Sequence, residues 1–182
     1  TGANRGLGAR LVTELLAAGA RRVYATARDT TTFADDVAAD PRVRVLALDV
    51  TDDAKVRAAA AVAGDVTVLV NNAGVLTFGG VLDGDLTGVE RDLATNYLGA
   101  LRVTRAFAPV VEQNAPAAVV NVLTLIALAP VGPMAGYSAS KAAAHSMTQA
   151  LRAGFRGRGA EALGAYPGGI DTGMLAGVEA DK

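Results

Sequence analysis

Short apolar runs that favour β-strands alternate with helix-forming stretches along the whole chain. We predict strands over residues 23–27, 43–48, 66–70, 118–123 and 162–166. Helices are predicted over residues 7–18, 53–63, about 87–111 and about 137–155, the third opened by a Thr87-x-x-Glu90 capping box. Strands that alternate with helices form crossover units, and these give a parallel sheet covered on both faces. We therefore expect one doubly wound α/β domain over residues 1–182.

Composition excludes several classes of protein. The 182 residues carry 17 Lys+Arg and 18 Asp+Glu, so no basic excess points to nucleic acid or to an anionic membrane as a partner. The absence of cysteine and the single histidine exclude a disulfide scaffold, a thiol nucleophile and a multi-histidine metal centre. We find neither an apolar stretch of about 18 residues nor a signal peptide. A soluble, cytoplasmic domain without a metal ion is expected.

A glycine-rich motif, Thr1-Gly2-Ala3-Asn4-Arg5-Gly6-Leu7-Gly8, lies directly before the first predicted helix. Glycines there let backbone N–H groups approach a pyrophosphate at a helix N-terminus, where the helix dipole favours anions. The spacing of the glycines differs from the commoner Gly-x-Gly-x-x-Gly fingerprint. Taken alone, such a motif more often marks a plain turn than a nucleotide site.

Two further motifs carry polar side chains. Asn71-Asn72-Ala73-Gly74 follows a predicted strand, at the end where such folds place their ligands, although alone it would be taken for a β-turn. Tyr137-Ser138-Ala139-Ser140-Lys141 places Tyr137 and Lys141 on one helix face, and neither serine shares it. Because an ammonium favours a nearby phenolate, we expect Lys141 to lower the pKa of Tyr137. The plain alternative is a pair on the helix surface.

These three motifs, in this order, resemble the short-chain dehydrogenase/reductase family, and the resemblance runs from Thr1 to about Met174. It implies a Rossmann-type fold and hydride transfer between a nicotinamide cofactor and a carbonyl or alcohol. Further segments match the family. Asp49-Val50 corresponds to the pair near the adenine ring, and residues 167–172 resemble the segment that closes over the nicotinamide.

The resemblance also implies the catalytic roles. Tyr137 would exchange a proton with the substrate oxygen, Lys141 would hydrogen-bond the nicotinamide ribose, and Asn96 would hold a water chain from Lys141 to solvent. The family's catalytic serine usually lies thirteen positions before the tyrosine, and Thr124 occupies that place here. Its hydroxyl would polarise the substrate carbonyl. Its extra methyl group and stiffer χ1 predict a working but slower or sterically narrower site.

One position bears on the choice of cofactor. NAD-binding sites often place a carboxylate about 20 residues past the glycine motif, on the ribose 2′-hydroxyl. Here that position is Arg28, whose guanidinium would pair with the 2′-phosphate of NADP(H), joined by Arg5. Asp29 is expected to point elsewhere. We predict NADP(H) rather than NAD, the alternative being that both arginines are simply exposed.

The residues expected to contact the cofactor come from all these segments. They are Gly2, Asn4, Arg5, Gly6, Leu7, Gly8, Arg28, Asp49, Val50, Asn72, Ala73, Gly74, Tyr137, Lys141, Pro167, Gly168, Ile170 and Thr172. The single histidine, His145, is expected to be structural rather than a proton shuttle.

The apolar residues over 125–136 favour a small, apolar carbonyl or alcohol as the substrate. Two other functions stay open. One is reduction of carrier-bound 3-oxoacyl groups, which the near-neutral charge does not favour, and the other is NADP binding without turnover. Contacts usual in the family predict a homodimer or homotetramer for the full-length protein.

In the strand order 3-2-1-4-5-6 the first strand is central, and it normally ends at the glycine motif. The sequence starts at that motif and ends soon after Thr172, so we expect an internal piece of a longer chain. Its sheet would have two unpaired edges, and the isolated piece would be poorly stable.

Overall fold

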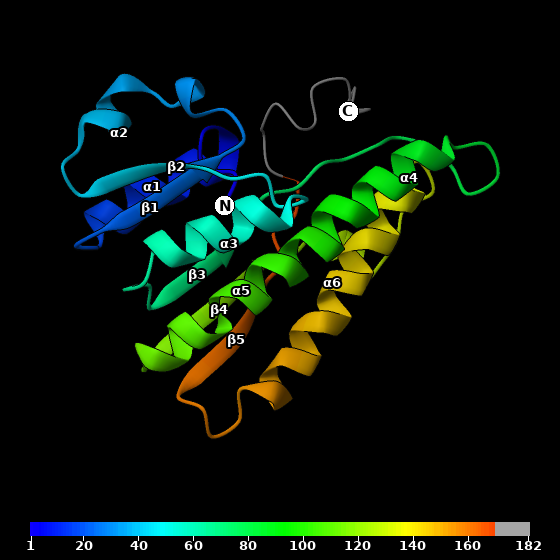
Figure 1. The fold of residues 1–182 in the computed structure, drawn as a ribbon. Helices are drawn as coiled ribbons and strands as arrows, with labels where there is room; N and C mark the ends of the chain where they lie inside the picture. Colours follow the sequence, from blue (N-terminus) through cyan, green and yellow to red (C-terminus); the bar gives the residue numbers. More distant parts are fainter. Residues whose placement is uncertain (170–182) are drawn as a thin grey trace.

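The structure, a computed structural model, describes residues 1–169 of the chain (Figure 1). Its helices are α1 (Gly6–Ala17), α2 (Asp35–Ala39), α3 (Asp53–Val62), α4 (Leu86–Asp92), α5 (Ala100–Gln113) and α6 (Ala135–Gly154). Its strands are β1 (Val23–Ala27), β2 (Val43–Ala47), β3 (Val68–Asn71), β4 (Ala117–Val122) and β5 (Ala160–Ala165). Short 3₁₀ turns follow β1 (η1, Thr30–Thr32) and β4 (η3, Leu125–Ala127), and the π-helical segment η2 (Leu93–Gly99) joins α4 to α5.

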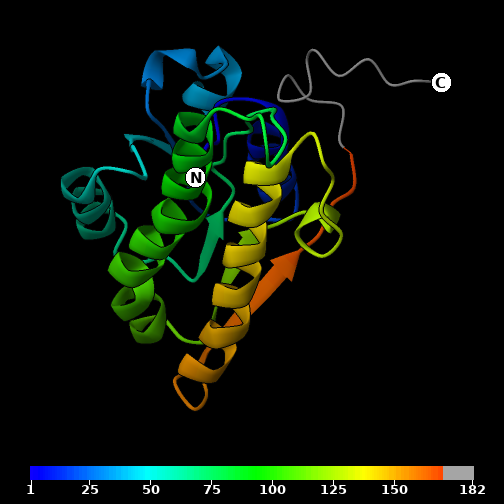
Figure 2. The same ribbon diagram turned by 90° about the vertical axis from the view of Figure 1, so that its right-hand side faces the viewer.

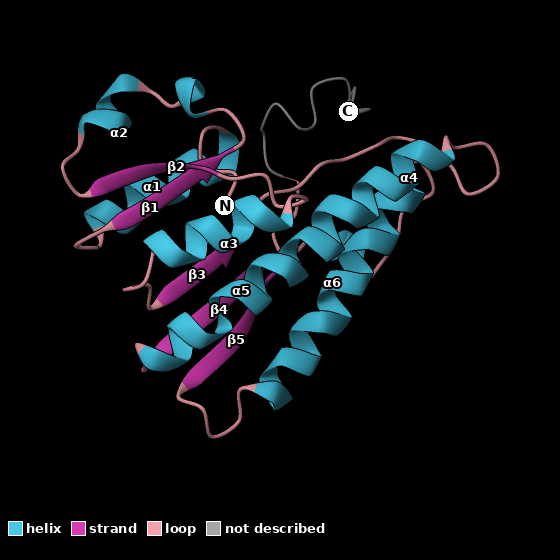
Figure 3. Cartoon of the chain, viewed as in Figure 1, coloured by secondary structure: helices cyan, strands magenta, loops and turns pink. Residues whose placement is uncertain are grey.

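The strands pair in parallel, in the two groups β1-β2 and β3-β4-β5. Helices α3, α5 and α6 lie on one side of the strands, whereas α1 packs on the other side against β1 (Figure 1, Figure 2). Figure 3 shows the same alternation of strand and helix along the chain. The doubly wound α/β arrangement predicted from the sequence is therefore confirmed.

Within residues 1–169 the facing edges of β1 and β3 form no ladder with each other. The first residues of the chain bridge them at their carboxyl ends. The backbone nitrogen of Thr1 donates to the Val70 carbonyl (2.8 Å), and that of Ala3 donates to the Thr26 carbonyl (2.9 Å). The glycine-rich motif is thereby fixed between the ends of two strands.

Two apolar clusters fill the interior. In the larger, Val103 and Val111 of α5 pack with Val119 of β4, and all three are fully buried. The smaller lies between α1 and β1, around Val12 and Ala25. Because burial of apolar surface is the main stabilising term, these clusters fix the strand ends that carry the polar motifs. None of the helices in the described part of the chain is long and apolar enough to cross a membrane.

Several predicted boundaries are wrong, each for a local reason. Helix α4 begins at Leu86 because the Asp85 carboxylate accepts a hydrogen bond from the backbone of Thr87 (3.1 Å), so the predicted capping box is not its cap. The single helix expected over 87–111 is divided by η2. Strand β5 begins two residues early, because Ala160 pairs with Ala117 in the ladder. Helix α2, η1 and η3 were not predicted.

Candidate active site

The glycine-rich motif is held in place by the motif that follows β3. The Thr1 hydroxyl oxygen accepts hydrogen bonds from the backbone nitrogens of Asn72 (3.1 Å) and Ala73 (3.0 Å). In return, the Asn72 carboxamide donates to the carbonyls of Thr1 (2.9 Å) and Gly2 (3.1 Å). The Asn72 side chain, predicted to contact the cofactor, therefore serves to fix the loop that precedes α1.

The glycines in this loop are required by its geometry. Gly2 and Gly6 have φ values of 62° and 53°, which favour glycine, and a Cβ on Gly8 would overlap the Gly2 carbonyl. No side chain caps the N-terminus of α1, and its first turn holds no acidic residue, whereas Asp52 and Asp85 cap α3 and α4. The first backbone N–H groups of α1 are thus left to an anion or to water.

Tyr137 and Lys141 lie on α6 and are buried, with 8% and 6% of their surface exposed. The Lys141 ammonium donates to the carbonyl of Val122 at the end of β4 (2.8 Å) and lies 5.8 Å from the centroid of the Tyr137 ring. A Cβ on Gly74 would lie 3.7 Å from Lys141 Nζ, so the motif after β3 adjoins the same group. The structure therefore gathers Tyr137, Lys141 and Gly74 at the carboxyl ends of β3 and β4.

Burial governs the protonation of this pair. It lowers the pKa of Lys141 to about 8 and raises the pKa of Tyr137 above its ordinary value. The predicted lowering of the Tyr137 pKa by Lys141 is therefore wrong for this structure. Its physical reason is that burial of the phenol, together with the negative charge of Asp92, raises the pKa of Tyr137, while the Lys141 ammonium donates to the Val122 carbonyl.

Thr124 lies two residues past the end of β4 and is also buried. Its hydroxyl oxygen accepts a long hydrogen bond from the backbone of Ile126 (3.4 Å), at the start of η3. Helix α6 packs against η3, so the turn that Thr124 caps lies against the helix that carries Tyr137.

Asn96 lies in the π-helical segment η2 with 3% of its surface exposed. Its side chain pairs with both backbone groups of Val75, each at 2.8 Å, and donates to the hydroxyl of Ser140 (2.9 Å). Ser140, fully buried, in turn donates to the carbonyl of Tyr137 (2.7 Å). Sequence reasoning set Ser140 aside as lying off the helix face of Tyr137. That was wrong, because residues three apart on a helix are neighbours, and Ser140 joins Asn96 to Tyr137.

Some of the residues predicted to bind the adenosine part of the cofactor are exposed, and others are buried. Arg5 and Arg28 are exposed, and within the described range neither is in a salt bridge. The Asp29 carboxylate accepts hydrogen bonds from the backbone and hydroxyl of Thr31 (2.9 and 2.7 Å), within its own turn. Asn4 lies next to this turn, because its carboxamide donates to the hydroxyl of Thr32 (2.8 Å).

Asp49 and Val50, both predicted to lie near the adenine ring, make contacts within the protein. The Asp49 carboxylate accepts hydrogen bonds from the backbone and hydroxyl of Thr51 (2.9 and 2.6 Å), and the hydroxyl contact above all lowers the pKa of Asp49. Val50 is buried, and a Cβ on Gly99 would lie 2.6 Å from one of its methyl groups. Gly6 and Leu7 form the first turn of α1.

The segment after β5 begins beside Thr124. The carbonyl of Pro167 accepts a hydrogen bond from the backbone of Leu125 (3.2 Å), and Gly168 follows it on the surface. His145 Nδ1 lies 2.6 Å from the hydroxyl of Tyr166, an arrangement consistent with the structural role expected for this histidine. The predicted cofactor contacts Ile170 and Thr172 lie outside the described residues.

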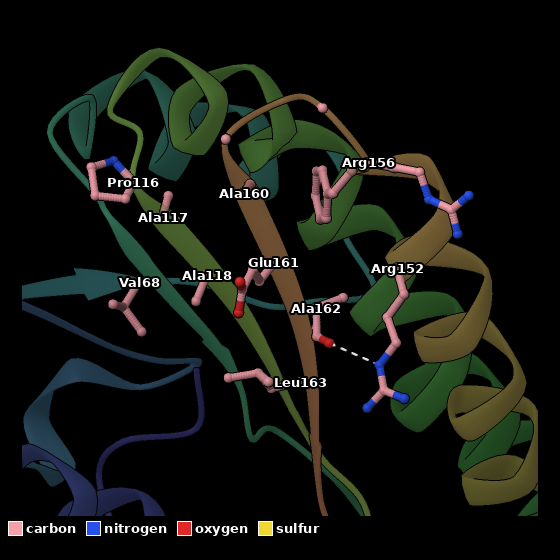
Figure 4. Close-up of a pocket in the computed structure, with 13 residues that line it drawn as sticks. Val68, Pro116, Ala117, Ala118, Arg152, Arg156, Ala160, Glu161, Ala162 and Leu163 are labelled. Carbon is pink, nitrogen blue, oxygen red and sulfur yellow. Dashed lines mark hydrogen bonds between the residues drawn. The ribbon is translucent and has the colours of Figure 1, made fainter.

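A hollow lies away from this site, at the amino ends of β3, β4 and β5, beside Arg152 and Arg156 (Figure 4). That is the end opposite to Tyr137, and open α/β sheets bind their ligands outside the carboxyl ends. Within residues 1–169, no group of three His, Cys, Asp or Glu side chains could hold a metal ion.

Comparison with known proteins agrees with this arrangement. The family profile described as short chain dehydrogenase matches residues 1–182. The chain is 35% identical to the short chain dehydrogenase pigC of Monascus ruber, over 97% of this chain and 63% of that protein.

Solved structures are similar over nearly the whole chain. A short chain dehydrogenase from Burkholderia cenocepacia J2315, in complex with NADP, has a TM-score of 0.94 and 40% identity, covering 100% of this chain and 76% of that one. A short chain dehydrogenase/reductase from Burkholderia phymatum, in complex with NAD, has a TM-score of 0.87 and 29% identity, covering 96% and 66%. Together with the buried Tyr137–Lys141 pair and the glycine loop, these matches place the chain in the short-chain dehydrogenase/reductase family.

Proposed function

We propose that the protein is an NADP(H)-dependent oxidoreductase that interconverts a small, apolar carbonyl compound and its alcohol, with Tyr137 as the acid and base. The observation that carries this proposal is the buried Tyr137–Lys141 pair at the strand ends. Burial of an ionisable pair costs free energy, and such sites are most often retained for chemistry. The measurement that tests it is the turnover of the Tyr137→Phe variant, described in the Discussion.

The residues present fit a dinucleotide. Gly2 and Gly8 leave no room for a side chain between the glycine loop and its neighbours, and the N-terminus of α1 is uncapped. Backbone N–H groups of Gly6 and Leu7 would therefore hold the pyrophosphate. The nicotinamide, when bound, supplies or accepts the hydride.

The chain's own groups would manage the proton and the developing charge. Tyr137 donates its proton to the substrate oxygen in reduction and takes it back in oxidation. A phenol is protonated at neutral pH, which is the form that reduction needs, and burial raises the pKa of Tyr137 further above that range. Thr124 donates a hydrogen bond to the same oxygen. Lys141 would hold the nicotinamide ribose, and Asn96 would maintain a water chain from Lys141 to solvent.

The preference for NADP(H) rests on Arg5 and Arg28. Both are exposed near the glycine loop, and one oxygen of the Asp29 carboxylate accepts two hydrogen bonds from Thr31. The positive charge of Arg28 also helps to lower the pKa of Asp49. A 2′-phosphate would find two guanidinium groups there, each able to form a charge-assisted contact with it.

Replacing Arg28 with alanine is expected to weaken NADPH binding about tenfold or more, since a charge-assisted hydrogen bond contributes roughly 1.5–3 kcal/mol. NADH binding should change less than about twofold, because NADH has no phosphate at that position. Fluorescence titration with both cofactors measures the difference. Arg21→Ala, an exposed arginine before β1, is the matched control. An equal loss for both cofactors would contradict the assignment.

An apolar substrate is proposed from the rim of the site. Leu125 and Leu128 follow Thr124 and are more than half exposed, and Val131 is also exposed. Phe78, exposed next to Gly79, adds an aromatic ring, because Gly79 pairs with the segment around Met134. Apolar side chains gathered at the entrance of a site favour an apolar ligand. The expected homodimer or homotetramer stays a prediction, which light scattering on the full-length protein checks.

A further inference from the structure

The carboxylate of Asp92, the last residue of α4, has no exposed surface and no step in the chemistry proposed above. Its two oxygens accept hydrogen bonds from the backbone (3.1 Å) and the hydroxyl (3.0 Å) of Thr77. The Arg91 guanidinium donates to the same hydroxyl (2.9 Å). Because burial of a carboxylate costs free energy that its hydrogen bonds only partly offset, we looked for a role of Asp92 in the site.

Asp92 acts together with Asn96, which lies four residues later. Asn96 pairs with both backbone groups of Val75, and Asp92 pairs with the backbone nitrogen of Thr77. Two buried side chains one helical turn apart therefore hold alternate residues of the segment that follows the Asn71–Gly74 motif. This segment, residues 75–79, is fixed along α4 and η2 by side chains rather than by a strand.

The other end of segment 75–79 is joined to the start of α6. The backbone of Gly79 donates to the Pro133 carbonyl (2.8 Å) and accepts from the backbone of Ala135 (3.2 Å), two residues before Tyr137. Helix α4 also touches α6 directly, because a Cβ on Gly136 would lie 2.8 Å from a methyl group of Val89. Figure 1 shows α4 lying over the start of α6. The position of Tyr137 therefore depends on α4 by two routes.

We propose that Asp92 is a positioning residue of the active site, which holds segment 75–79 through Thr77 and thereby fixes the start of α6 around Tyr137. The proposal rests on the proposed function, in which Tyr137 is the acid and base. It goes beyond that function because Asp92 touches neither substrate nor cofactor in it.

Electrostatics also connects Asp92 with Tyr137. Burial is the main cause of the raised Tyr137 pKa, and the negative charge of Asp92 raises it further. The cations that face the two groups are Lys141, on the same helix as Tyr137, and Arg91, beside Asp92. Burial also raises the pKa of Asp92 itself, while the Thr77 hydrogen bonds and Arg91 oppose that rise. The Asp92 charge thus helps to keep Tyr137 protonated.

The Asp92→Asn variant separates this role from a purely structural one. It keeps an oxygen that can accept from Thr77 but removes the charge. The phenol of Tyr137 is expected to titrate at a lower pH than in the wild type, because removal of a nearby negative charge favours the phenolate. Backbone amides of residues 75–79 are expected to exchange with deuterium faster, because the carboxylate hydrogen bonds are weakened.

The titration is read from the ultraviolet absorbance of tyrosinate, with the Tyr137→Phe variant of each protein subtracted so that Tyr137 alone is followed. Asp85→Asn is the matched control, since Asp85 caps the same helix but is exposed. Asp92→Glu, which restores the charge, should return the Tyr137 titration close to that of the wild type. A Tyr137 titration unchanged in Asp92→Asn, or shifted equally in Asp85→Asn, would overturn the proposal.

If Asp92→Asn does not fold, Thr77→Val carries the test. Valine has the shape of threonine without the hydroxyl that Asp92 and Arg91 bind. Faster exchange over residues 75–79 and at the start of α6 is expected, and exchange unchanged there would overturn the proposal. Neither measurement requires cofactor or turnover. Activity of the Tyr137→Phe variant would refute the proposed function, but the titration and exchange results on Asp92 could still be interpreted.

Discussion

Replacing Tyr137 with phenylalanine is expected to lower kcat about a thousandfold or more, within the range that general acid catalysis contributes. The reason is that the phenol is the proton donor of the buried pair, with its ring centroid 5.8 Å from Lys141 Nζ. NADPH binding should change less than about threefold, since phenylalanine preserves the ring that packs in the site. Oxidation of NADPH in the presence of apolar aldehydes and ketones measures the first quantity, and fluorescence titration measures the second.

Tyr24→Phe is the matched control. Tyr24 lies on β1, away from the active site, and its hydroxyl donates a hydrogen bond to Asp65. It should keep the wild-type kcat. Turnover retained by Tyr137→Phe would refute the role of Tyr137 as the acid. NADPH binding lost by that variant would instead show that Tyr137 contributes chiefly to the shape of the cofactor site.

Removal of the Thr124 hydroxyl is expected to have the second largest effect. Thr124→Val keeps the branched shape but cannot donate a hydrogen bond, so kcat/KM should fall about 10²–10³-fold, as for loss of one oxyanion donor. Thr124→Ser keeps the hydroxyl, and its freer χ1 should leave kcat equal to or above that of the wild type. Steady-state kinetics on one carbonyl substrate compares the three proteins.

The melting temperatures of the three proteins must agree before the kinetics are interpreted, because Thr124 is buried and begins η3. Similar activity of the valine variant and the wild type would show that the substrate oxygen is polarised by another group. Loss of activity in the serine variant would mean that the methyl group of Thr124 itself shapes the site.

The sequence predicted the alternation of strands and helices because apolar periodicity reflects burial, which a parallel sheet imposes on every strand. Strand β1 was predicted with its observed bounds, Val23–Ala27. The start of α4 was predicted incorrectly. Asp85 and Thr87 are both suitable N-cap residues, and only the path of the backbone selects Asp85. The π-helical segment η2 could not be read from propensity, since its residues would also fit an ordinary helix.

For the site, the sequence supplied the residue types and their order but not their contacts. Tyr137 and Lys141 are four residues apart, so the helix brings them together. Asn96 and Ser140 are 44 residues apart, and Thr77 and Asp92 are 15 apart, so only the packing of helices reveals these pairs. The direction of the Tyr137 pKa was mispredicted for a related reason: burial and the charge of Asp92 both raise it, and neither can be seen in the sequence.

The most direct test of the whole account is a fluorescence titration of the purified, folded protein with NADPH and, in parallel, with NADH. It examines the glycine loop, the uncapped α1 and the two arginines in one experiment. We predict that NADPH binds at least about tenfold more tightly than NADH, the difference expected from a phosphate paired with arginine. Tighter binding of NADH would contradict the roles of Arg5 and Arg28, and a folded protein that binds neither cofactor would contradict the proposed function itself.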